Sequence, residues 1–166
     1  MDEDREYGRA EGKAFRLLTL RAHSEKELRA KLKAGGFAEP VVEGVIQRCR
    51  ELGYLNDEAF ARQRARVLAV SRLAGDRRIA FDLRERGIDA GLSAQVIAEV
   101  RGELDEEEAA KRLLRKKIRG RPVAALNERE KAGLARSLMG KGFPTGLILK
   151  ILKKTEEEGF HDDDGE

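Results

Sequence analysis

The sequence contains no tryptophan, one cysteine, three prolines and few aromatic residues, which occupy 5% of its 166 positions. A lone cysteine, Cys49, rules out an internal disulfide framework and favours a reducing compartment. We expect Cys49 to be a small buried hydrophobe. No apolar run is long enough to cross a bilayer, and the first twelve residues are acidic where a signal peptide would be basic. We therefore expect a cytoplasmic protein without membrane contact.

The residue patterns that enzymes require are also missing. The chain has no glycine-rich phosphate loop, no paired cysteine site and no nucleophile with a base and an orienting group. His23 stands just before a helix cap, so we expect a local packing role. His161 lies in the acidic string HDDDGE, which predicts weak, adventitious metal binding at most. We predict no enzyme, no catalytic or metal-binding residue and no cofactor.

What the chain does contain favours helix throughout. More than half of its residues are Ala, Glu, Lys, Leu or Arg, and β-branched residues rarely cluster. Charged residues make up 39%, against about 25% in an average protein. They replace small polar residues and leave the apolar fraction ordinary. This composition predicts an all-α protein made of thin layers with much surface.

The net charge of +3 hides an uneven distribution. Residues 1–12 carry −3 and residues 155–166 carry −7, which leaves +13 on residues 13–154. One interpretation is two solvated, disordered ends around a moderately basic body. The other is a body that binds polyanions or acidic protein surfaces, with acidic ends that compete for the same sites.

Capping signals divide the chain into helices. Ser24 and Glu27 form a capping box, and Asp105 with Glu108 and Asn127 with Glu130 repeat its spacing. Further caps are Asn56 or Asp57 before one helix and Asp76 before the next. The predicted helices are 10–22, 25–34, 40–52, 57–74, 76–86, 92–100, 105–118, 128–141 and 144–154.

Three copies of one pattern are aligned on the glycines Gly36, Gly87 and Gly142. In each copy a leucine stands four residues before the glycine, a large apolar residue follows it, and an apolar pair stands nine and ten residues after it. A three-helix unit of this size buries little by itself, so neighbours should stack. We predict an all-α fold of three tandem three-helix repeats, stacked as an elongated, curved solenoid. The predicted segments are a disordered acidic N-terminus (1–9), three repeats (10–52, 53–102 and 103–155) and a disordered acidic tail (156–166).

The motifs of these repeats resemble the RecX family of bacterial RecA regulators. The resemblance covers nearly the whole chain and rests on RAHS (21–24) with Glu27-Leu28, on GYLND (53–57) with Phe60-Ala61, and on GDRRI (75–79) with Gly87-Ile88. The third copy adds Lys141-Gly142-Phe143. Arg64 departs from the pattern, which leads us to expect an aromatic residue there.

The resemblance implies a non-enzymatic protein that binds in the groove of the RecA filament on DNA. There it would limit filament extension, strand exchange, ATP hydrolysis and the co-protease activity, and so affect DNA repair, recombination and the SOS response. The implied partner is RecA, with single- or double-stranded DNA bound directly or through the filament. We expect a monomer. Composition and spacing alone indicate only a basic helical repeat that binds something large and negatively charged.

An alternative is a protein that binds DNA directly and non-specifically, because three-helix units can be helix-turn-helix folds. The third helices are poorly equipped to read bases: the first repeat offers Gln47, Arg48 and Arg50, and the second offers Gln95. A phosphate binder would lose affinity for bare DNA steeply as salt rises.

We predict that the binding surface consists of outward-facing cations in two groups. Arginine is favoured in such a surface because it pairs with phosphate or carboxylate through two parallel hydrogen bonds. The second group, at the end of a helix that begins with three glutamates, also matches the helix dipole and could be purely structural. The predicted residues are Arg62, Arg66, Arg72, Arg77 and Arg78 in the first group and Arg115, Lys116, Lys117, Arg119 and Arg121 in the second.

Overall fold

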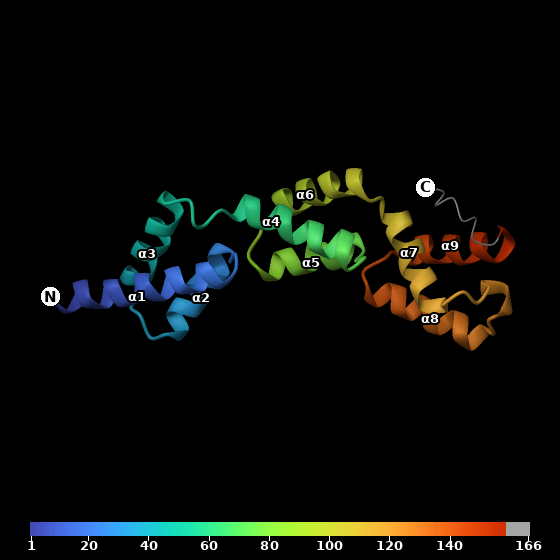
Figure 1. The fold of residues 1–166 in the computed structure, drawn as a ribbon, viewed down its shortest axis with the longest axis horizontal. Helices are drawn as coiled ribbons and strands as arrows, with labels where there is room; N and C mark the ends of the chain where they lie inside the picture. Colours follow the sequence, from blue (N-terminus) through green and yellow to red (C-terminus); the bar gives the residue numbers. More distant parts are fainter. Residues whose placement is uncertain (159–166) are drawn as a thin grey trace. The chain divides into compact units, whose positions relative to one another are not determined.

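The computed structural model describes residues 1–158, which form nine α-helices and no strand (Figure 1). This confirms the predicted all-α class and the division into three helices per repeat. The elongated, curved stacking stays a prediction. The disordered tail predicted over residues 156–166 was wrong for residues 156–158, which are helical. The rest of that tail and the weak metal binding predicted at His161 lie outside the described residues. The helices are α1 (Asp2–Leu20), α2 (Glu25–Ala34), α3 (Glu39–Glu51), α4 (Asp57–Arg66), α5 (Asp76–Glu85), α6 (Ala90–Glu103), α7 (Glu106–Ile118), α8 (Glu128–Gly140) and α9 (Thr145–Glu158).

The chain forms two compact units, which divide it within the second repeat. The first unit holds residues 1–64 and 83–93, and the second holds residues 65–82 and those from 94 onward. The core of the first unit is built from α1, α2 and α3 around the fully buried Leu28, Leu32 and Ile46. Cys49 is fully buried in the same core, as predicted.

Helix α1 begins at Asp2, although the sequence predicted disorder over residues 1–9 and a helix from Ala10. The extra turns are helical because they are docked on α3. The Glu6 carboxylate accepts a 2.8 Å hydrogen bond from the Ala38 N–H, which starts α3. The Tyr7 ring lies against Gly44, whose missing side chain leaves room for it. The acidic residues of the first turn also favour the positive end of the helix dipole.

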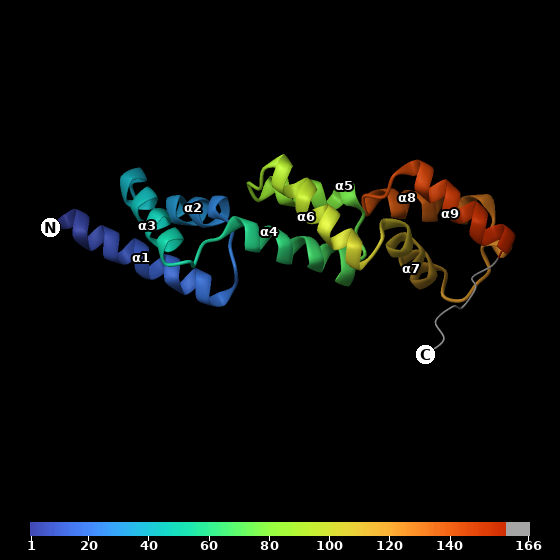
Figure 2. The ribbon, with the colours of Figure 1, turned by 90° about the horizontal axis from the view of Figure 1, so that it is seen from above.

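The second unit contains the bundle of α7, α8 and α9 (Figure 2). Its core includes the fully buried Leu114, Leu138 and Ile151. The end of the α4 segment contributes Leu73 to this core, after a single π-helical turn, η1 (Val67–Ser71). Leu73 takes a left-handed conformation (φ 52°) with only 5% of its surface exposed, so burial of its side chain offsets the backbone strain.

Two capping predictions at this point were wrong. The helix predicted over residues 57–74, with Gly75 as its stop, ends at Ser71, and Gly75 lies in the connection to α5. Asp76 is the first residue of α5 and not its cap, because its carboxylate bonds to the Arg101 guanidinium at 2.7 Å. The predicted caps Ser24, Asp105 and Asn127 do form. Asn56 caps α4 by accepting from the Ala59 N–H at 3.0 Å.

The same charged clasp holds each repeat to the next one. In the first unit, the Glu25 N–H at the start of α2 donates to Asp57, the first residue of α4, at 2.8 Å, and Arg50 pairs with the Glu25 carboxylate at 2.6 Å. The clasp recurs in the second unit: the Asp76 N–H at the start of α5 donates to Glu106, the first residue of α7, at 3.0 Å, and Arg101 pairs with Asp76. Burial raises the pKa of both accepting carboxyls, Asp57 and Glu106.

The third repeat carries the clasp with its charges exchanged. Counting from the glycine that ends the second helix, Lys131 stands where Glu25 and Asp76 stand, and Glu156 stands where the arginines stand. These two residues form an ion pair of 2.9 Å. Helix α8 also begins one turn earlier than its counterparts when it is counted back from the same glycine. The third repeat therefore keeps the two clasp positions but fills them with an ion pair of the opposite orientation.

Candidate anion-binding surface

Beside the first clasp, one glutamate pairs with two arginines. Glu27, in the first turn of α2, pairs with Arg21 at 3.1 Å and also with Arg86, which follows the end of α5. Burial opposes ionisation of this carboxyl, but the hydrogen bonds from Arg21 and from the Ser24 N–H hold its pKa below the ordinary value. We call this arrangement the first junction; its two arginines and one glutamate leave a net charge of +1.

The corresponding place in the second unit has a cation where the glutamate would be. Arg78 takes the position of Glu27 in the first turn of α5, 51 residues later, while Arg72 takes that of Arg21 and Lys141 that of Arg86. Arg77 is its neighbour in the same turn. We define Arg72, Arg77, Arg78 and Lys141 as the second-junction cluster. None of these four side chains forms an ion pair with any residue of 1–158.

Close backbone contacts hold these cations together. The Gly75 N–H donates to the Lys141 carbonyl oxygen at 2.8 Å, and the Lys141 Nζ donates to the Arg72 carbonyl oxygen at 3.3 Å. A side chain on Gly142, which has φ 92°, would overlap the backbone of Arg78. The cations therefore lie around the start of α5, where the helix dipole adds further positive potential. Such a place favours a polyanion.

Sequence reasoning found three members of the cluster and missed Lys141. The signal was available, because Lys141 immediately precedes the third aligned glycine, as Arg86 precedes the second. What the sequence could not supply is the contact, which joins residues 69 positions apart. The structure therefore brings Arg72, Arg77 and Arg78 together with a fourth cation.

Four of the other predicted arginines are engaged in ion pairs. Arg62 pairs with Glu58 at 2.8 Å in the first unit. In the second unit Arg66 holds Glu103 through three hydrogen bonds, the shortest 2.6 Å, and this pairing raises its pKa. The two remaining pairs are Arg115 with Glu108 at 3.6 Å and Arg121 with Glu130 at 2.9 Å. A paired arginine is a weaker ligand for an outside anion because the existing pair must break.

The last predicted residues lie at the far end of α7. Lys116, Lys117 and Arg119 are exposed there and form no ion pair within the described chain. Glu106, at the other end of α7, belongs to the clasp, so about 20 Å of helix separates this second basic surface from the second-junction cluster. Pairs within α7, such as Lys111 with Glu107 at 2.9 Å, support the helix itself.

The other candidate residues are used internally. The His23 ring is buried, its Nδ1 lies 2.9 Å from the Arg21 carbonyl oxygen, and burial lowers its pKa. Gln47 donates to Glu51 at 3.1 Å and Gln95 donates to Glu99 at 3.2 Å, so the polar heads that could read bases are already bonded. No helix of residues 1–158 combines the length and apolar character needed to traverse a bilayer.

Fold and surface together define a class: a helical-repeat protein with one ion-paired junction and one junction whose four side chains are all cationic. Comparison with known families identifies the family within this class. The first, second and third three-helix domains of RecX match residues 10–49, 56–97 and 105–152. The chain belongs to the RecX family of regulatory proteins.

Individual relatives agree with this assignment. The chain is 36% identical over 146 residues to the regulatory protein RecX of Thermus thermophilus, covering 88% of this chain and 92% of that protein. It is 30% identical over 141 residues to RecX of Syntrophotalea carbinolica, covering 85% and 92% of the two chains. The crystal structure of RecX from Lactobacillus salivarius has the same fold, with a TM-score of 0.75 at 19% identity over 93% of this chain and 98% of that one.

Proposed function

We propose that this protein regulates RecA by binding the RecA filament on DNA and limiting its extension, with the second-junction cluster as the principal contact. Membership of a family of regulatory proteins supports the role, and a basic body supports a nucleoprotein partner. On this proposal the protein acts in the cytoplasm, as a monomer and without catalysis. Lower ATP hydrolysis, strand exchange and co-protease activity would follow from a shorter or blocked filament.

The observation that carries the proposal is the replacement of Glu27 by Arg78 at the equivalent position. In the first junction the glutamate pairs with both neighbouring arginines, whereas in the second junction only like charges stand around one helix start. Gathering like charges destabilises a fold. The same position of the repeat carries a stabilising charge in the first junction and a destabilising one in the second. An anionic ligand at the second junction best explains this difference.

Groove binding fits the same residues. Phosphates of DNA inside a filament and carboxylates on its protein wall both pair with arginine through two parallel hydrogen bonds. The chain offers Arg72, Arg77 and Arg78 for this purpose within one short stretch. The exposed group of Lys116, Lys117 and Arg119 provides a second contact about one α7 length away.

The alternative is direct, non-specific binding to DNA, since the cluster would also accept bare phosphates. The decisive experiment adds the protein to RecA, single-stranded DNA and ATP and follows hydrolysis and filament length. We expect inhibition at amounts well below one protein per RecA monomer, because a bound regulator affects many subunits. No effect at ratios up to one per monomer would contradict the proposal.

A parallel titration of bare single-stranded DNA across a salt series separates the two functions. A direct phosphate binder shows an affinity that falls steeply with salt and is the same with or without RecA. A filament regulator acts at salt concentrations where its binding to bare DNA is already lost. Inhibition that tracks the occupancy of bare DNA would favour the alternative.

A further inference from the structure

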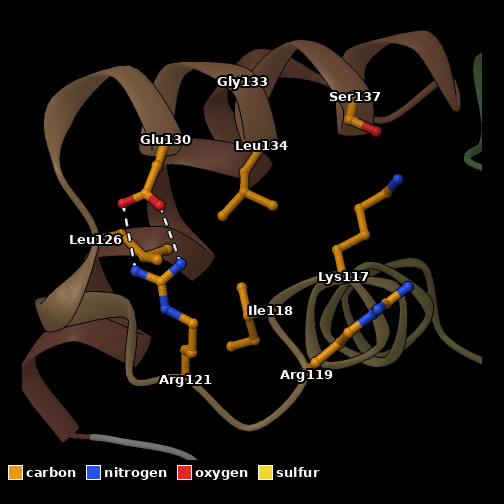
Figure 3. Close-up of a pocket in the computed structure, with 9 residues that line it drawn as sticks. All are labelled: Lys117, Ile118, Arg119, Arg121, Leu126, Glu130, Gly133, Leu134 and Ser137. Atoms are coloured by element: carbon orange, nitrogen blue, oxygen red, sulfur yellow. Dashed lines mark hydrogen bonds and ion pairs between the residues drawn. The ribbon is translucent and has the colours of Figure 1, made fainter.

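A cavity of about 590 Å³ lies between the end of α7 and the face of α8 (Figure 3). Ile118 and Leu134 point toward each other across it, and Leu126 lines its side. Lys117 and Arg119 stand at its edge. The cavity thus combines an apolar lining with a cationic rim.

The one carboxylate that lines the cavity is already neutralised. Glu130 accepts two hydrogen bonds from Arg121, at 2.9 and 3.5 Å, and a third from the Asn127 N–H at 3.0 Å. The bond from Arg121 holds the pKa of Glu130 below its ordinary value. Lys117 and Arg119 have no such partner among residues 1–158. The rim therefore has an excess of positive charge.

The long connection between α7 and α8 creates this cavity. In the first repeat only residues 21–24 join the first two helices, whereas in the third repeat residues 119–127 do so and include a short 3-10 turn, η2 (Val123–Ala125). The longer connection holds Arg119 and Arg121 beside α8. The cavity is therefore a property of the third repeat and plays no part in the clasps between repeats.

The chain itself supplies a segment with matching chemistry. Residues 159–166, GFHDDDGE, contain one large apolar residue, Phe160, and four acidic residues, of which Asp162, Asp163 and Asp164 are consecutive. An aromatic ring suits the apolar lining, and the carboxylates suit Lys117 and Arg119. This is charge complementarity between two parts of one molecule.

The segment also follows a helix that packs beside the cavity lining. Two residues before the end of α9, Glu156 pairs with Lys131, the neighbour of Glu130 on α8. Helix α9 also packs against η2, which directly precedes Leu126. Phe160 stands two residues after Glu158 and the three aspartates four to six, so an extended chain carries them up to about 7 Å and about 13–22 Å from the end of α9. The segment is therefore attached to a helix that packs beside the cavity lining.

We propose that residues 159–166 bind in this cavity, with Phe160 on its apolar lining and the aspartates at Lys117 and Arg119. The bound segment occupies cations that would otherwise meet an outside polyanion, so it acts as an internal competitor. The docking does not depend on the proposed function. The competition with a nucleoprotein filament rests on it.

The docking is tested by a nitroxide label at residue 166 in an E166C variant, read by NMR. Cys49 is fully buried, so the label reacts at the new cysteine. We expect paramagnetic broadening concentrated on residues 117–121 and 130–137. The broadening should disappear in a K117E/R119E background and persist in K153E/K154E, a matched change at two exposed lysines of α9 outside the cavity lining. Broadening that is absent, spread evenly, or lost equally in both backgrounds would overturn the proposal.

The competition is tested with the full-length variant D162N/D163N/D164N. Its affinity for a single-stranded oligonucleotide at low salt should rise about three- to tenfold over the unchanged chain, and the gain should vanish in a K117A/R119A background. An unchanged affinity, while the label still reports docking, would remove the regulatory role and leave the docking intact. An oligonucleotide that perturbs residues 117–137 without releasing the labelled segment would show that the two bind together, and would overturn the proposed competition.

Discussion

Glu27 and Arg78 occupy the same position of the repeat, in the first turn of the second helix, and carry opposite charges. Glu27 pairs with two arginines. Around Arg78, Arg72 and Lys141 add to the positive charge. This difference separates a junction that only holds repeats together from one that is suited to a ligand.

The first prediction concerns the stability of the second junction. Changing Arg78→Glu recreates the arrangement of the first junction and also places an acid at the positive end of α5. We expect the melting temperature to rise by about 1–3 °C, because relieved repulsion and new surface pairs are worth up to about 1 kcal/mol. Thermal unfolding followed by circular dichroism measures it. Arg136→Glu, the same change at an exposed residue of α8, serves as the control and should not raise it. A lower melting temperature for Arg78→Glu would show that the cluster is not repulsive.

The second prediction separates two exposed arginines. Although 65% of its side chain is exposed, Arg66 is held by Glu103, whereas Arg78 has no acidic partner among residues 1–158. Arg78→Gln should therefore weaken binding to the RecA filament several-fold. It should also lower, by about one, the slope of the logarithm of the binding constant against the logarithm of the salt concentration. Arg66→Gln should change the affinity and the salt slope by less than about twofold each, because the Arg66 side chain is already paired with Glu103. Fluorescence anisotropy with labelled filaments provides the measurement. Equal losses would mean that the Arg66 pair opens on binding.

The third prediction compares equivalent arginines of the two clasps. The Arg101 side chain is 12% exposed and bonds to Asp76 and to the carbonyl oxygens of Ala74 and Leu104, whereas that of Arg50 is 47% exposed. Removing a buried partner leaves polar groups unsatisfied. Arg101→Ala should lower the free energy of unfolding by about 2–4 kcal/mol, and Arg50→Ala by less than about 1 kcal/mol.

Denaturant unfolding gives both values. Arg101→Lys tests the geometry, because an ammonium group cannot reproduce the guanidinium fork that serves three acceptors. It should recover little of the loss. Equal costs for Arg50→Ala and Arg101→Ala would show that burial does not set the strength of the clasp.

The fourth prediction follows from Glu107 in the third repeat. Hydrogen bonds from Lys150 on α9 and Lys111 on α7 lower its pKa to about 2. Because the folded pKa lies below the unfolded value, the pair stabilises the fold above about pH 4.5 and this contribution is lost as pH falls toward 2. The melting temperature of the unchanged chain should exceed that of Glu107→Gln at about pH 7, and the two should converge near pH 2. A difference that does not depend on pH would rule out the ion pair as its source.

Local rules predicted most of the helices and several of their caps. The Ser24 and Asn127 capping boxes form as expected because each depends on residues three positions apart. Errors arose where distant contacts decide the outcome. Glu6 and Tyr7 extend α1 because they dock on α3, and Asp76 is drawn away from capping by Arg101.

The binding surface was predicted less well, for a related reason. A helix pattern shows that Arg66 faces outward but not that Glu103, 37 residues away, will hold it. The helix pattern also does not show that Lys141 belongs to the cluster, because Lys141 joins it through hydrogen bonds to Gly75 and Arg72. Exposure could be predicted from the sequence, whereas the pairing of charges could not.

The most direct test of the central claim is ATP hydrolysis by RecA on single-stranded DNA, titrated with the unchanged protein and with an Arg72→Glu/Arg78→Glu variant. We predict that the unchanged protein inhibits at substoichiometric amounts and that the variant, with the same helix content and an equal or higher melting temperature, loses at least about ten times in potency, the equivalent of about 1.4 kcal/mol. Equal inhibition by the two proteins would contradict the assignment of the second-junction cluster as the contact with the filament.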